Sequence, residues 1–389
     1  MIRCDYGDNT LSTQTTQIPN MSTNSTTIPA TGENKRQLNF EILRIIAMCM
    51  IIIMHYIVKG IDTPKLSVDM SLSNMIWWLL YAFSVGAVNI YVLISGYFLA
   101  DSKWHLDKVF SLYLTVWVYS AFVPLTLGAL GKLDLGSLSL GDWQQILLPI
   151  EYEHYWFATA YLMMYVLTPV LAIAVRSLSK EILRSVIAGL VILFSALKSV
   201  NPYLIPWDKY GNDVLWFIVL FMIAGYIRRF GVPGNISVKA RLMTYVLVSV
   251  LIFIAELVLA FIVRRTGKME YMLDMLCANN HILALTSSVA LFTAFIGIRA
   301  NGFGKKTEKI IILFSSSTFG IYLLHENLFV RNSWASWLGV DRLDNTALKL
   351  LFLIISIIVL FMVGTVVDRV RAGIFKLFGK KIVRGTKGE

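Results

Sequence analysis

The stretch LNFEILRIIAMCMIIIMHYIV (Leu38 to Val58) is long and apolar enough to form a membrane-spanning helix, and it decides the class of fold. Two of its polar residues, Arg44 and His55, lie eleven positions apart. Eleven steps of about 100° return a helix to within ~20° of its starting direction, so the two side chains share one face, ~16 Å apart along the axis. Such groups are costly at membrane depth and are found where they line a cavity or meet partners.

The residue types of this pair indicate two different tasks. An arginine suits a phosphate-bearing ligand, and a histidine is the commonest proton-transfer group. Together they favour chemistry on a charged cofactor within the membrane. A structural alternative stays open, in which Arg44 neutralises Glu41 one turn earlier or reaches the lipid headgroups, and His55 is a satisfied histidine near the outer boundary.

The rest of the chain has the composition of a polytopic, all-α membrane protein. Of its 389 residues, 57% are hydrophobic and 15% are charged, with a mean hydropathy of +0.66. The net charge of +11 resides mostly in loops and in the C-terminal tail, so we expect membrane lipids and no nucleic acid as partners. Three cysteines form no metal-binding spacing, and we expect no metal.

About ten spans are predicted, at residues 38–58, 75–98, 107–130, 155–175, 181–199, 213–230, 239–263, 281–299, 309–330 and 347–367.

These segments give three regions. Residues 1–36 are polar and predict a disordered tail, in which Met21 is an alternative start. Residues 37–370 form the predicted transmembrane domain, and residues 371–389 a basic tail. Most Lys and Arg residues fall on one side when both termini are placed in the cytoplasm, so we expect a multi-pass protein of the cell membrane in that orientation.

Two further residues, Gly96 and Glu256, are unusual within predicted membrane spans. Gly96, in the segment NIYVLISGYFL (Asn89 to Leu99), permits either the close approach of another helix or a local break. Glu256 is an isolated acid in the seventh predicted span, and we expect it to pair with Arg264 or Arg265 two turns later.

The segment EYEHYWF (Glu151 to Phe157) precedes the fourth predicted span on its outer side. Carboxylates, an imidazole and aromatic rings together suit the recognition of sugar hydroxyls and sugar faces. A belt of aromatic residues at the membrane interface has the same composition, and that alternative stays open. The candidate acceptor-binding residues are Glu151, Glu153, His154 and Trp156.

The segment SSSTFGIYLLHENLFVR (Ser315 to Arg331) places His325 and Glu326 at about the depth of His55. A second imidazole beside a carboxylate favours an acid–base site, with Glu41 as possible further support, and a polar helix end is the alternative. The chain has no phosphate-binding glycine loop, HExxH or GxSxG motif, so ATP hydrolysis, zinc proteolysis and serine-hydrolase chemistry lack support.

Four motifs in matching order resemble those of the acyltransferase 3 family of membrane-bound acyltransferases, over residues 37 to about 370. They are Arg44 with His55, Ile94-Ser-Gly-Tyr-Phe-Leu99, Trp156-Phe157, and Ser317-Thr-Phe-Gly-Ile-Tyr-Leu-Leu-His325. The resemblance implies a ten-helix enzyme that transfers acetyl, or in some members succinyl or a longer acyl group, from coenzyme A to carbohydrate. The chain is most similar to the shorter branch, which modifies exopolysaccharide and capsule.

By this resemblance, His55 is the essential histidine and Arg44 its companion. We expect acyl-CoA as co-substrate, with its phosphates near Arg44, Lys103 and Lys108, and a glycan or lipid-linked saccharide as acceptor. His55 acts either as a base toward the acceptor hydroxyl or as a carrier of the acyl group. The alternative functions are a transporter or flippase for a glycan or lipid-linked intermediate, and a non-catalytic component of a polymer-assembly complex.

Overall fold

The computed structural model describes residues 37–201, 203–204, 208–300 and 302–385, with side chains up to residue 377. These residues belong to the unit Gln37–Glu389. The predictions for residues 1–36, including Met21 as a start, lie outside the described residues. The described part contains helices and loops without strands, which confirms the predicted all-α class.

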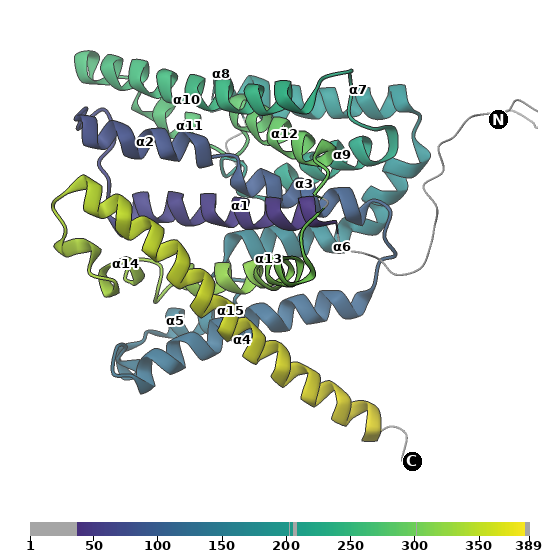
Figure 1. Cartoon of the computed structure of the whole chain (residues 1–389), viewed down its shortest axis with the longest axis vertical. Coiled ribbons are helices and arrows are strands. Elements are labelled where there is room, and N and C mark those ends of the chain that lie inside the picture. Colours follow the sequence, from purple (N-terminus) through teal and green to yellow (C-terminus); the bar gives the residue numbers. More distant parts are fainter. Residues whose placement is uncertain (1–36, 202, 205–207, 301, 386–389) are drawn as a thin grey trace, which may run out of the picture. The chain divides into compact units, whose positions relative to one another are not determined.

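The long helices begin within a few residues of the predicted spans, and Figure 1 shows their arrangement. In chain order they are α1 (Leu38–His55), α2 (Leu72–Ser84), α3 (Ala87–Leu99), α4 (Leu106–Ala129), α5 (Leu140–Leu147), α6 (Trp156–Ser177), α7 (Lys180–Val191), α8 (Leu197–Val200), α9 (Val214–Phe230), α10 (Val238–Thr266), α11 (Glu270–Leu276), α12 (Ile282–Gly297), α13 (Lys305–His325), α14 (Trp334–Trp337) and α15 (Thr346–Gly385). Two π-helical turns, Tyr56–Gly60 and Ile192–Ala196, extend α1 and α7.

Eight helical stretches of the described residues are long and apolar enough to cross a membrane, so the protein is a multi-pass membrane protein. Each coincides with a predicted span, and α2 and α3 together form one of them, Leu72–Leu99. The other two predicted spans, 213–230 and 281–299, fall on α9 and α12, which have only 17 and 16 residues. The count of ten spans therefore stays a prediction.

Helix α1 lies in the middle of the helices in Figure 1 and contacts α2, α3, α12, α13 and α15. Because it has neighbours on several sides, none of its apolar residues is exposed, and Phe40, Leu43 and Ile52 are almost fully buried. This central position explains the nearly continuous apolar sequence of the opening stretch. It also places the end of α1, at His55, inside the protein.

Helices α3 and α9 approach each other closely at Gly96. A Cβ atom at this position would lie 2.9 Å from the Cα of Phe221, so only glycine permits the contact. This confirms the prediction that Gly96 serves close helix packing. Asn89 fixes the same pair of helices by accepting a 2.9 Å hydrogen bond from Trp216 Nε1, and it donates one of 2.8 Å to the carbonyl of Asn279.

Candidate active site

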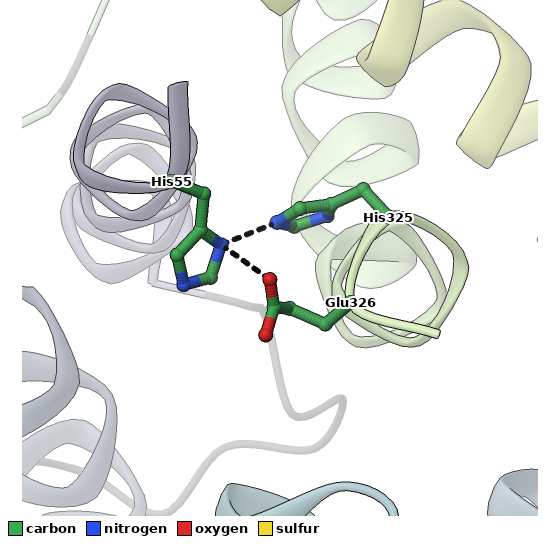
Figure 2. Close-up of side chains that lie close together, drawn as sticks. All are labelled: His55, His325 and Glu326. Atoms are coloured by element: carbon green, nitrogen blue, oxygen red, sulfur yellow. Dashed lines mark hydrogen bonds and ion pairs between the residues drawn. The ribbon is translucent and has the colours of Figure 1, made fainter. Parts of the chain in front are cut away.

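Three side chains from opposite ends of the chain meet where α1 and α13 end. His55 Nδ1 lies 3.0 Å from His325 Nε2 and 3.1 Å from Glu326 Oε1. Figure 2 shows the two imidazole rings turned toward each other, with the Glu326 carboxylate beside them. His325 and Glu326 are buried, and His55 is partly accessible. The structure therefore brings together three of the residues that the sequence singled out.

The hydrogen bonds assign the tautomers of both rings. His325 Nδ1 lies 2.7 Å from the carbonyl oxygen of Ile321, so this nitrogen donates and Nε2 of the same neutral ring accepts. His55 Nδ1 faces two acceptors, that nitrogen and the Glu326 carboxylate, and it must carry the proton. The lone pair of neutral His55 is then on Nε2. Figure 2 shows Nε2 on the side of the ring away from both partners, and it forms no hydrogen bond with any residue that the structure describes.

Lys59 completes the charge balance of this cluster. Its Nζ lies 2.7 Å from both carboxylate oxygens of Glu326. Burial alone raises the pKa of a carboxyl, but the interactions with His55 and Lys59 outweigh it and lower the pKa of Glu326 to about 2. Glu326 is therefore an anion at neutral pH. Our sequence analysis missed Lys59, although its position four residues after His55 was a signal that both side chains could face one partner.

The turn that carries Glu326 is held by the segment before α6. Asn327 donates a 2.8 Å hydrogen bond to the hydroxyl of Tyr155, and the Leu328 N–H donates one of 3.3 Å to His154 Nε2. His154 Nδ1 lies 3.1 Å from the carbonyl of Gln145, so the ring is neutral with its proton on Nδ1. Burial lowers the pKa of His154 to about 4, which keeps it neutral. His154 thus stabilises the turn that carries Glu326.

His55 lines a cavity of about 520 Å³. Its wall carries Lys59, Glu256 and Cys277 together with several rings and amides; the rings are Trp78, Tyr81, Trp156 and Tyr210, and the amides Asn212 and Asn279. Aromatic faces with a few polar groups are typical of small-molecule sites.

Of the four candidate acceptor residues, Trp156 alone lines this cavity. Glu151 and Glu153 are exposed. Glu153 pairs with Lys209 at 2.6 Å, and Glu151 accepts a 3.3 Å hydrogen bond from the hydroxyl of Tyr113. The four predicted acceptor residues are therefore separated in the structure. Trp156 lines the cavity, and His154 holds the turn that follows Glu326. Glu151 and Glu153 lie at the surface.

The candidate donor-binding residues lie apart from one another. Arg44 Nη1 forms a 2.8 Å ion pair with Glu41 Oε1, as one of the alternatives expected. Its remaining guanidinium nitrogens form no hydrogen bond with the residues that the structure describes, and its side chain is 29% exposed, so it can still bind an anion. Lys103 is exposed, and Lys108 lines a separate cavity of about 280 Å³ with Arg371.

The expected pairing of Glu256 with Arg264 or Arg265 is wrong. Glu256 Oε1 instead accepts a hydrogen bond from Cys277 Sγ at 3.1 Å. Arg264 is eight residues further along α10, about 12 Å of helix rise away, and this distance exceeds the reach of an ion pair. No sequence pattern indicated Cys277 as the partner of Glu256, because it lies in a different segment, after α11.

The cluster also has the composition of a metal site. His55, His325 and Glu326 each offer one ligand atom, and these atoms lie within 4.8 Å of one another. Two imidazoles and one carboxylate are a set that zinc enzymes use. Here, however, the Lys59 ammonium bridges both carboxylate oxygens, and a dication would have to displace it. The residues present fit acid–base chemistry better than metal binding.

A protein-family model matches the chain. The model of the family designated acyltransferase 3, described as an acyltransferase domain, matches residues 37–367, which is most of the chain. It covers α1 through the greater part of α15 and contains the whole cluster around His55. No curated protein and no solved structure matches significantly.

Proposed function

Because the chain belongs to the acyltransferase 3 family, and is therefore a membrane acyltransferase, we propose that it transfers an acyl group, acetyl by preference, from acyl-CoA to a hydroxyl of a cell-surface or exopolysaccharide glycan. One observation carries the proposal. The basic nitrogen of His55 has no partner among the described residues, and the opposite nitrogen is held by an ionised carboxylate at 3.1 Å. This arrangement of an imidazole and an orienting anion is that of a general base.

This geometry supports the following reaction. His55 Nε2 takes the proton of the acceptor hydroxyl as its oxygen attacks the thioester carbonyl carbon. The imidazolium that forms is stabilised through Nδ1–H by Glu326, which is 3.1 Å away. The C–S bond then breaks, and the imidazolium returns its proton to the thiolate of coenzyme A. The products are an O-acyl glycan and free coenzyme A, and His55 is neutral again.

A covalent route uses the same groups. His55 Nε2 attacks the thioester carbonyl carbon, the C–S bond breaks, and coenzyme A leaves as a thiolate that takes a proton from solvent, while the acyl group stays on the imidazole. The acceptor hydroxyl then attacks the acyl group, the C–N bond breaks, and the hydroxyl proton is released to solvent. This route suits an acceptor outside the cell, since coenzyme A cannot cross the bilayer. In both routes the donor phosphates lie toward Arg44, ~16 Å of helix rise from His55, with Lys103 and Lys108 as further cations. Both termini are then cytoplasmic and the protein resides in the cell membrane.

Replacing His55 tests the proposal. Purified His55→Ala should lose acyl transfer from radiolabelled acetyl-CoA to deacetylated surface polysaccharide by about 10² to 10⁴-fold, the usual contribution of a general base. His281→Asn is a matched control, because His281 is also a buried histidine but caps α12 by accepting a hydrogen bond from the Leu283 N–H, and an asparagine oxygen can accept it instead. Full activity in folded His55→Ala would refute both routes. Glycan flux without acetyl-CoA would support a transporter instead.

A further inference from the structure

The cavity that His55 lines extends to a carboxylic acid that the proposed reaction does not use. Glu256 lies within α10, is 2% exposed, and lines the same cavity as His55. Its Oε1 is occupied by the thiol of Cys277 at 3.1 Å. Its Oε2 is buried and has no hydrogen-bond partner among the residues that the structure describes.

A buried carboxyl with an unpartnered oxygen does not stabilise a fold. Buried polar atoms are nearly always hydrogen-bonded, because leaving one without a partner forfeits the interactions it makes with water. Helix α10 is otherwise strongly apolar through its middle, with a window of mean hydropathy 3.0. A leucine at position 256 would match that surrounding sequence without leaving an unsatisfied oxygen. An unpartnered acid that lines a cavity is the kind of group that a ligand completes.

The neighbours of Glu256 indicate the class of ligand. The aromatic rings of Trp78, Tyr81 and Tyr210 line the same cavity. Asn212 and Asn279 line it too, and Asn279 Nδ2 donates a 2.7 Å hydrogen bond to Asn212 Oδ1, which leaves the other amide atom of each side chain for a ligand. Rings that stack on a sugar face, beside amides that bond its hydroxyls, suit a saccharide. The acid on this wall has a free acceptor oxygen, which pairs with a hydrogen-bond donor of the ligand.

We propose that Glu256 is a specificity-determining residue of the acceptor pocket, and that Oε2 accepts a hydrogen bond from a hydroxyl of the acceptor sugar. This hydroxyl is distinct from the one acylated at His55. The inference rests on the proposed function, since it names the second point at which that function's acceptor is held. Two fixed points, His55 and Glu256, orient the sugar so that one of its hydroxyls reaches Nε2.

Kinetics of Glu256 variants test the assignment. Glu256→Leu should raise the KM for alkali-deacetylated surface polysaccharide at least tenfold and leave the KM for acetyl-CoA unchanged. Glu256→Gln, which keeps one oxygen, should recover part of the loss. Ser249→Ala is the matched control, because Ser249 is another buried polar residue of α10 but does not line the cavity. An unchanged polysaccharide KM in Glu256→Leu overturns the proposal.

A second measurement keeps the test valid if those variants fail to fold. In a variant with Cys4→Ser and Cys49→Ser, Cys277 is the remaining thiol and it lines the cavity beside Glu256. Deacetylated polysaccharide should slow labelling of Cys277 by a small thiol reagent. Labelling that polysaccharide leaves unchanged, or a Cys277 that does not label at all, overturns the proposal. His55-dependent hydrolysis of acetyl-CoA without acceptor reports the proposed function separately.

Discussion

In the proposed mechanism, Glu326 stabilises the imidazolium form of His55, and the size of this effect follows from the structure. Two unit charges 3.1 Å apart interact by about 5 kcal/mol at an effective dielectric constant of about 20. Glu326→Gln keeps the shape of the side chain and removes its charge. Since each 1.36 kcal/mol changes a rate tenfold, we expect kcat to fall on the order of 10³ to 10⁴-fold.

The assay is acyl transfer from radiolabelled acetyl-CoA by purified protein, with thermal unfolding in the same detergent as a test of folding. Glu326→Gln leaves Lys59 as an unpaired cation, so the double variant with Lys59→Met restores neutrality and should recover stability without recovering kcat. Asp341→Asn, at an exposed acid, controls for the loss of one negative charge. A folded Glu326→Gln protein with kcat within tenfold of the wild type would show that this carboxylate does not act on His55.

Three further outcomes are expected. Lys59→Met should move the acid limb of the pH profile of kcat/KM to higher pH, because the histidine–carboxylate pair loses its nearest fixed cation and holds a proton more tightly. Burial lowers the pKa of His154 to about 4, from an ordinary value of about 6.5. The neutral ring therefore contributes its full stabilisation above about pH 6.5, and this contribution falls by about 3 kcal/mol as pH drops to 4. The difference in Tm between wild type and His154→Gln, measured across this range, should show the loss. Gly96→Ala should destabilise the protein by about 1–3 kcal/mol in the same unfolding assay, because the added methyl group meets the backbone of Phe221 at 2.9 Å, and an unchanged Tm would contradict the close contact.

The long helices could be predicted from the sequence because a membrane span requires a continuous run of about twenty mostly apolar residues. Helices α9 and α12 are the exceptions in length, since they have only 17 and 16 residues. The helix that contains Arg44 and His55 was also predictable from its own residues. Their shared face required only the pitch of a regular helix, and α1 is regular from Leu38 to His55.

The site itself depends on contacts that no local pattern encodes. His55 and His325 are 270 positions apart, and the sequence could place them at a similar depth but not side by side. The role of Lys59 was missed because its partner Glu326 lies 267 positions away, so that the spacing from His55 alone could not identify the ion pair. The hydrogen bond between Cys277 and Glu256 was equally unpredictable, since neither segment has a local pattern that identifies the other residue as a partner.

The ion pair between Lys59 and Glu326 joins residues at opposite ends of the transmembrane sequence. During synthesis, His55 enters the bilayer long before the ribosome has produced α13. A nascent protein therefore carries a histidine without its carboxylate until nearly every span has been inserted. In the proposed mechanism, the general base therefore lacks its orienting anion during most of synthesis, and the site is assembled only when biogenesis is almost complete.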